Sequence, residues 1–311
     1  MPSLVARRTP VIGLAPTGNK LDQFPAFPDR LKQGQINTVL LARMLKQGVF
    51  NSDPAFQRPD GSGVFPGASA EMFYYGVSLG GIMGTWFAAL TPDLKRLNVD
   101  VPAMNFAMLL QRSTQFIAFE QLLAGIGLTD PMRTLLTLSL NHEVWVRSEP
   151  AGYVRHVTNN PLPGTNKKHM LVTMAWLDKQ VSNQATEILV RSLGVPNLTS
   201  SVQQGFAEIP DMVPPLDSAL VVYDTGSYDI FNPLHYQVVG SGPLIPPLAN
   251  RIPSGTCDPH AARLTIPASL DQLAAFLRPG GRVENFCDGL CDASIPYERP
   301  GGAATSCNPL N

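Results

Sequence analysis

The chain has 311 residues, of which 44% are hydrophobic and 15% charged, and its formal net charge is -1. This composition allows a large buried core and argues against disorder. No Lys/Arg-rich stripe is present, which argues against a nucleic-acid partner. No stretch reaches the roughly 18 apolar residues of a membrane helix, and Met1–Arg8 lacks the apolar run of a signal peptide. We therefore expect neither a membrane span nor a nucleic-acid ligand.

The N-terminal part predicts a strand and then a helix. The apolar run Pro10–Ala15 ends at a Pro-Thr-Gly turn, as a buried strand does. Asp29 is a candidate N-cap, and Gly48 is the expected end of the helix. The helix has apolar residues at helical spacing: Ile36, Val39, Leu40, Leu41, Met44 and Leu45. Residues 49–70 are rich in Pro, Gly, Asp and Ser and predict a loop.

Strands and helices alternate along the rest of the chain. We expect strands over 71–77, 97–101, 169–176 and 218–223, and helices over 79–90, 183–193 and 270–277. This alternation predicts an α/β fold with a mostly parallel sheet and helices on both faces. Residues 104–157 have a helical pattern without a strand, which indicates a cap inserted over the end of the sheet. The expected division is a core of 1–103 and 158–285, a helical cap of 104–157, and a Cys- and Gly-rich tail of 286–311.

Ser78 is the candidate nucleophile. Gly76-Val77-Ser78-Leu79-Gly80 fits Gly-x-Ser-x-Gly, with a strand directly before it and a Gly- and Ala-rich helix directly after it. Such a turn places the serine at its apex, and we expect side chains at positions 76 and 80 to collide with backbone. The Leu79 amide, at the helix N-terminus, would face an oxyanion on the substrate. The simpler reading is a Gly-rich turn with an incidental serine.

A nucleophilic serine needs a base, and five histidines are available. In the strand-turn-helix type of serine hydrolase the chain order is Ser, acid, His. This order excludes His142 and His156, and His169 opens a strand at the wrong end of the sheet. His260, in a loop before the last helix, is the expected base, and His235 is the fallback.

Asp178 is the expected acid, because it directly follows the strand 169–176. Open α/β sheets build their sites at the carboxyl ends of the strands. Asp224 and Asp229, after the last strand, are competitors, although turn formation explains them as well.

Taken together, these residues resemble bacterial α/β-hydrolases of the esterase/lipase kind from about Pro10 onward. The resemblance is carried by the elbow 75–81, by Asp178-Lys179-Gln180-Val181, which is similar to the family's Asp-x-x-Val, and by Asp258-Pro259-His260. It implies an α/β-hydrolase fold and a Ser78–His260–Asp178 triad that needs no cofactor or metal. The chain departs from the family before the elbow. Pro10–Ala15 looks like the family's fourth strand, so we expect an N-terminally shortened sheet.

The shortened start has two expected consequences. The family loop that supplies a second oxyanion donor, often around His-Gly, is missing, and Ala15–Gly18 is the candidate replacement. The strand Pro10–Ala15 would lie at or near a sheet edge, which proteins cover. We expect cover from the segment Met1–Thr9 or from a second copy of the chain, giving a homodimer.

The predicted function is hydrolysis of a small carboxylic ester through an acyl-enzyme. Met104, Phe106 and Phe116 of the cap would line the acyl pocket, although ordinary helix core explains such residues too. Two alternatives remain open: a catalytically weak binding protein of the same fold, and a serine peptidase with the same triad.

Four cysteines lie in the last fifth of the chain. Their even number predicts two disulfides, Cys287–Cys291 and Cys257–Cys307, and an oxidising compartment, secreted or periplasmic. A zinc site formed by Cys257, His260, Cys287 and Cys291 is a weaker alternative, and free thiols are a third.

Overall fold

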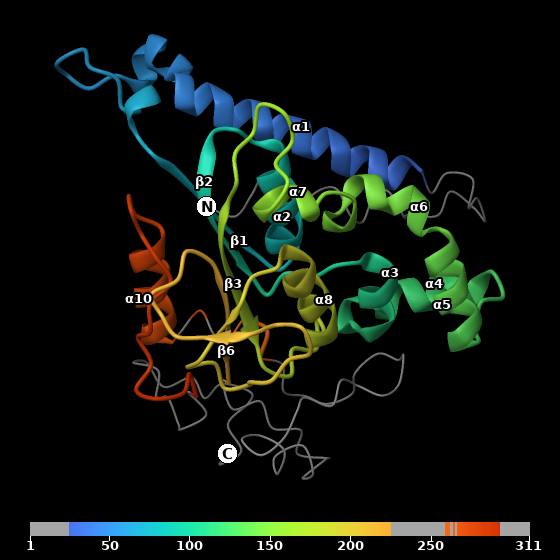
Figure 1. Cartoon of the computed structure of the whole chain (residues 1–311). Coiled ribbons are helices and arrows are strands. Elements are labelled where there is room, and N and C mark those ends of the chain that lie inside the picture. The colour runs from blue at the N-terminus through green and yellow to red at the C-terminus, as the bar shows by residue number, and fades with distance from the viewer. Residues whose placement is uncertain (1–24, 225–258, 262–263, 265, 293–311) are drawn as a thin grey trace, which may run out of the picture.

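The computed structural model describes residues 25–224, 259–261, 264 and 266–292 (Figure 1). Their strands form one open, all-parallel sheet of six strands in the order β1-β2-β3-β6-β4-β5. The strands are β1 Met72–Val77, β2 Leu94–Asp100, β3 His169–Ala175, β4 Asn197–Leu198, β5 Asp211–Met212 and β6 Ala219–Tyr223. The predicted α/β class with a parallel sheet is confirmed. The short strands β4 and β5 were not predicted.

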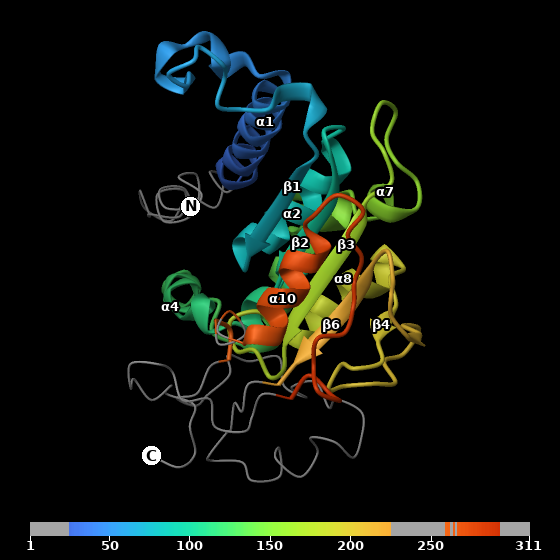
Figure 2. The same cartoon turned by 90° about the vertical axis from the view of Figure 1, so that its left-hand side faces the viewer.

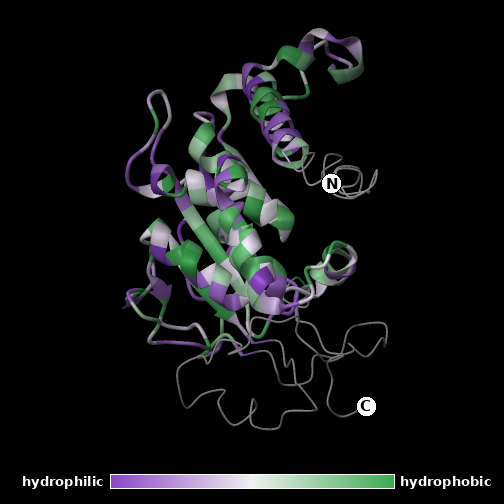
Figure 3. Cartoon of the chain, turned by 90° about the vertical axis from the view of Figure 1, so that its right-hand side faces the viewer, coloured by the Kyte–Doolittle hydropathy of each residue, from purple (hydrophilic) through white to green (hydrophobic). Residues whose placement is uncertain are grey.

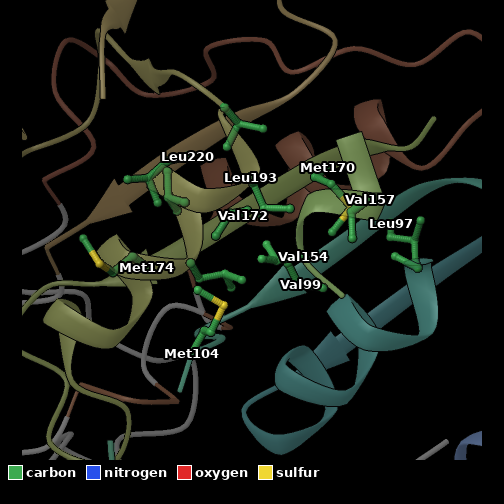
Figure 4. Close-up of a cluster of buried hydrophobic side chains, with 14 of the residues drawn as sticks. Leu97, Val99, Met104, Val154, Val157, Met170, Val172, Met174, Leu193 and Leu220 are labelled. Carbon is green, nitrogen blue, oxygen red and sulfur yellow. The ribbon is translucent and has the colours of Figure 1, made fainter. Parts of the chain in front are cut away.

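Helices cover both faces of the sheet (Figure 2). The helices that follow or precede strands are α1 Ala26–Gln47, α2 Leu79–Leu90, α8 Asn183–Leu193 and α10 Pro267–Phe276. The main core lies between the sheet and α2 and α8, and includes Leu97, Val99, Met170, Val172 and Met174 (Figure 4). On the opposite face Leu171 and Val221 pack with Phe276 of α10. Successive strand residues therefore face different helix layers, which is why these strands are nearly continuous apolar runs.

The helical pattern of residues 104–157 is confirmed, but it forms several short helices. They are α3 Phe106–Leu109, α4 Ile117–Gly125, α5 Pro131–Leu140, α6 His142–Trp145 and α7 Arg155–Thr158. Short 3-10 turns join them over Leu110–Arg112, Thr114–Phe116, Val146–Ser148 and Pro150–Gly152. α5 starts where Asp130 accepts the Arg133 N–H and Pro131 opens the helix. The division of the chain into core, cap and tail remains a prediction.

α1 differs from expectation in two ways. Gly48 ends the helix as predicted, with φ 67°. Asp29, however, lies in the first turn, where it pairs with Lys32 and Arg147, and Pro25 is the N-cap. Most of the predicted apolar face is exposed, although Val39 packs against the main core, and α1 carries both hydrophobic and hydrophilic residues along its length (Figure 3). The exposed residues are Ile36, Leu40, Leu41 and Met44.

Several expectations fall outside the described residues, among them the strand Pro10–Ala15, the segment Ala15–Gly18 and the pair Cys257–Cys307. The predicted disulfide Cys287–Cys291 is present. Along the described stretch of chain, none of the helices is both long and apolar enough to span a bilayer. Residues 49–70 form three short 3-10 turns, Val49–Ser52, Pro54–Phe56 and Gly67–Ser69, within a loop.

Candidate active site at the carboxyl edge of the sheet

Ser78 sits at a sharp turn between β1 and α2. Its backbone has φ 58° and ψ -124°, a conformation that non-glycine residues rarely adopt. Two hydrogen bonds hold the turn: the Ser78 N–H donates to the Asp100 carbonyl at 2.9 Å, and the Ile82 N–H donates to the Ser78 carbonyl at 2.9 Å. The strand–elbow–helix arrangement therefore matches what the motif predicts.

The glycines around Ser78 serve different purposes. A Cβ at Gly76 would lie 2.4 Å from the Gly80 carbonyl oxygen, and one at Gly81 would lie 2.7 Å from the Asp100 carbonyl oxygen. Both positions therefore need glycine. At Gly80 the expected collision is not found, because a Cβ there would meet no described atom within 4 Å. Glycine at position 80 is therefore not required by a clash with any described atom.

Asp178 follows β3 and is held by a tight turn. Leu177 in this turn has φ 63°. Asn183, at the start of α8, holds the turn with two hydrogen bonds. Its Oδ1 accepts the Leu177 N–H at 2.8 Å, and its Nδ2 donates to the Ala175 carbonyl at 2.7 Å. The Asp178 Oδ1 accepts the backbone N–H groups of Gln180 and Val181, each at 2.8 Å. The carboxylate is buried, and these two bonds direct its other oxygen to a further partner.

That partner is His260. Its Nδ1 lies 2.7 Å from the Asp178 Oδ2, and the two side chains are 8% and 1% exposed, respectively. They are 82 residues apart in the sequence. Because Nδ1 is engaged with the carboxylate, Nε2 is the ring atom that can accept a proton from another group. Of the competing residues, Asp224 lies at the end of β6, where its N–H donates to the Cys291 carbonyl, and Asp229 and His235 lie outside the described residues.

The sheet register brings Ser78 and Asp178 to one edge. Val77 pairs with Asp100, and Asp100 pairs with Thr173, so the carboxyl ends of β1, β2 and β3 lie in line. Ser78 and Asp178 follow the first and third of these strands. This is the edge at which open α/β sheets build their sites.

Asp100, between these two strand ends, was not predicted as a site residue. Its buried carboxylate accepts the Thr173 hydroxyl at 2.7 Å, and the Tyr75 hydroxyl lies 3.4 Å away. The available signal was an aspartate at the carboxyl end of a predicted strand, the same signal that identified Asp178.

A cavity of about 350 Å³ lies within the helical segment. Its lining includes Phe116, Leu123, Ala124, Leu128 and Thr134. Of the three predicted pocket residues only Phe116 borders it. Met104 packs in the main core, and Phe106 packs against Trp145 with ring centroids 5.6 Å apart.

The segment that leads to this cavity contacts the Asp178 turn directly. The Thr114 N–H donates to the Lys179 carbonyl, and the Gln115 Nε2 donates to the Gln180 Oε1, both at 2.9 Å. Residues 114–116, of which Phe116 borders the cavity, are therefore hydrogen-bonded to the turn that carries Asp178.

The described residues include no group of three or more His, Cys, Asp or Glu side chains arranged to bind a metal. The disulfide uses Cys287 and Cys291, which are two of the four ligands that the zinc alternative requires. The donor set for that alternative is thus incomplete.

Comparison with known proteins returns no matching family model and no matching curated sequence. The fold, the contact between Asp178 and His260, and the position of Ser78 at the same edge of the sheet therefore carry the functional argument.

Proposed function

We propose that this chain is a carboxylic ester hydrolase in which Ser78 is the nucleophile, His260 the base and Asp178 the acid. The observation that carries the proposal is the buried 2.7 Å contact between Asp178 and His260, at the sheet edge where Ser78 occupies a strained turn. A buried carboxylate on Nδ1 orients an imidazole and stabilises its protonated form. An incidental serine in a glycine-rich turn needs no such pair.

The reaction proceeds in two halves. His260 Nε2 takes the Ser78 hydroxyl proton as Oγ attacks the ester carbonyl, and the proton passes to the alcohol as it leaves. Water then loses a proton to His260 and attacks the acyl-Ser78; His260 returns the proton to the Ser78 oxygen as the acid leaves, which restores the hydroxyl. The Leu79 N–H, at the first position of α2, stabilises the oxyanion, a role worth about 2.7–4 kcal/mol per donor.

The cavity behind Phe116 is the proposed place for the acyl group of the ester. Its lining mixes apolar and polar side chains, and the hydrogen bond from Thr114 to Lys179 keeps the segment that borders it beside the Asp178 turn. A small ester with a short or medium acyl chain fits this picture.

The first test combines activity-based labelling with ester turnover. A fluorophosphonate should label the wild type on a single peptide containing Ser78, and p-nitrophenyl esters should be hydrolysed. Ser78→Ala and His260→Ala should each lower kcat by at least about 10³-fold, since triad members act as a unit. His156→Ala is the control, because His156 is a half-buried histidine whose Nδ1 lies 2.6 Å from the Asn160 carbonyl oxygen rather than from a carboxylate.

Each alternative has its own outcome. Absence of labelling at Ser78 in the folded wild type would overturn the proposal and favour a binding protein. Labelling together with turnover of amide but not ester substrates would favour a peptidase.

A further inference from the structure

Tyr74 links the two sides of the elbow at Ser78. It belongs to β1, and its hydroxyl donates to the Gly80 carbonyl, in the first turn of α2, at 2.7 Å. The hydroxyl thus ties the residues before Ser78 to the residues after it. Its ring also packs against Phe87 of α2, with centroids 5.5 Å apart.

Two glycines make room for this ring. A Cβ at Gly84 would lie 2.3 Å from the Tyr74 Cε1 atom, and a Cβ at Gly76 would lie 2.7 Å from the same atom. Gly84 lies outside the Gly-x-Ser-x-Gly motif, and the Tyr74 ring supplies a specific reason for glycine there. The elbow is therefore built around the tyrosine as well as around Ser78.

The strained conformation of Ser78 requires contacts that hold it, and the hydrogen bond from the Tyr74 hydroxyl is one of them. A residue at φ 58° keeps that conformation only where its surroundings hold it. The orientation of the Leu79 N–H depends on the backbone of Ser78 and Gly80, because Leu79 lies between them. A shift of the first turn of α2 would move this donor relative to the Ser78 Oγ.

We propose that Tyr74 is a positioning residue for the nucleophile elbow: its hydroxyl bond to Gly80 holds Ser78 and the Leu79 amide in their working arrangement. The inference rests on the proposed function. Burial raises the pKa of Tyr74 to about 12, so the hydroxyl remains a donor throughout the pH range in which a His-dependent hydrolase works. Tyr74 contacts no reacting atom in this scheme and acts through backbone alone.

The test compares Tyr74→Phe with Tyr223→Phe. Tyr223 is the control, because its hydroxyl also makes hydrogen bonds inside the protein, donating at 2.9 Å to the Gln272 Oε1 and engaging Ser269 on the α10 side of the sheet. Both variants should lower Tm by at least about 2–4 °C, because each removes a tyrosine hydroxyl that is hydrogen-bonded inside the protein. Only Tyr74→Phe should lower kcat, by about tenfold, with KM within twofold of the wild type.

The rate of fluorophosphonate labelling at Ser78 should fall in parallel with kcat in Tyr74→Phe. Gly84→Ala offers a second test, because the new Cβ would displace the Tyr74 ring without changing Tyr74 itself. It should give the same loss of kcat at constant KM. Equal kcat values for Tyr74→Phe and Tyr223→Phe would overturn the inference. A wild type that neither labels nor turns over esters would instead overturn the proposed function, so the two failures are distinguishable.

Discussion

At the scale of single residues, backbone strain marks the same edge of three neighbouring strands. Ser78, Val101 and Leu177 have φ values of 58°, 43° and 63°, and they follow β1, β2 and β3 closely. Residues in such conformations cost about 1–3 kcal/mol each and concentrate at functional sites. Glu208 is the other described non-glycine residue with positive φ. The clustering supports the assignment of this edge as the site.

The strain at Ser78 can be measured directly by comparing two inactive variants. Ser78→Gly should be more stable than Ser78→Ala by about 1 kcal/mol, because glycine adopts positive φ without steric cost. The free energy of unfolding from denaturant titration is the measurement. Ser139, exposed in the last turn of α5, is the control, because glycine in a helix is less stable than alanine, by up to about 1 kcal/mol. If the glycine variant were less stable than the alanine variant at both serines, the elbow would not be strained.

At the scale of elements, a buried carboxylate joins the start of α3 to the chain that follows α6. Glu149 is fully buried, and its Oε2 accepts the Phe106 N–H at 2.9 Å. Its Oε1 lies 3.3 Å from the His142 Nδ1. The contact with Glu149 raises the pKa of His142 above its ordinary value. The relative position of α3 and α6 therefore depends in part on His142, a group whose charge changes with pH.

The stabilisation from His142 should depend on pH. Because its folded pKa is raised, the stabilisation is complete below the ordinary value of about 6.5 and is lost as pH rises through the folded value. His142→Gln should accordingly destabilise the protein more at pH 5.5 than at pH 8.5, measured by urea unfolding at both pH values. His156→Gln is the control, since its Nδ1 lies 2.6 Å from a carbonyl oxygen, that of Asn160, rather than from a carboxylate. A destabilisation by His142→Gln that is equal at the two pH values would contradict this reading.

At the scale of the whole molecule, one side of the sheet stays open within the described chain. β1 pairs with β2 alone among the described strands, and α1 exposes an apolar stripe in the same N-terminal part of the chain. An unpaired strand edge and an exposed apolar helix face are both features that proteins usually cover. The predicted homodimer would provide such cover.

The dimer prediction can be tested by size-exclusion chromatography with light scattering. We expect the wild type to elute as a dimer and Leu40→Lys to shift it towards the monomer, because a charge on the exposed stripe of α1 opposes burial. Met132→Lys on α5 is the matched control, since Met132 is 70% exposed and Leu40 is 54% exposed. A wild type that is monomeric at every concentration and fully active would show that the described sheet needs no second copy.

The sequence by itself determined the features that depend on neighbours along the chain. The elbow at Ser78, the bounds of α2 and α8, the end of α1 at Gly48 and the pair Cys287–Cys291 all follow from short-range geometry. Periodicity and glycine placement report local backbone conformation, which is why these predictions agree with the structure. The α/β class followed from the alternation of such local units.

The tertiary structure alone decided the relations between distant residues. Chain order and resemblance had proposed Asp178 and His260 but left Asp224 and His235 open; the contact itself, across 82 residues of chain, is known only from the packing. The structure also showed that α1 keeps its apolar stripe exposed and that Gly84 makes room for the Tyr74 ring. Periodicity marks a face as apolar, but only packing determines what that face meets, because burial depends on elements that are remote in sequence.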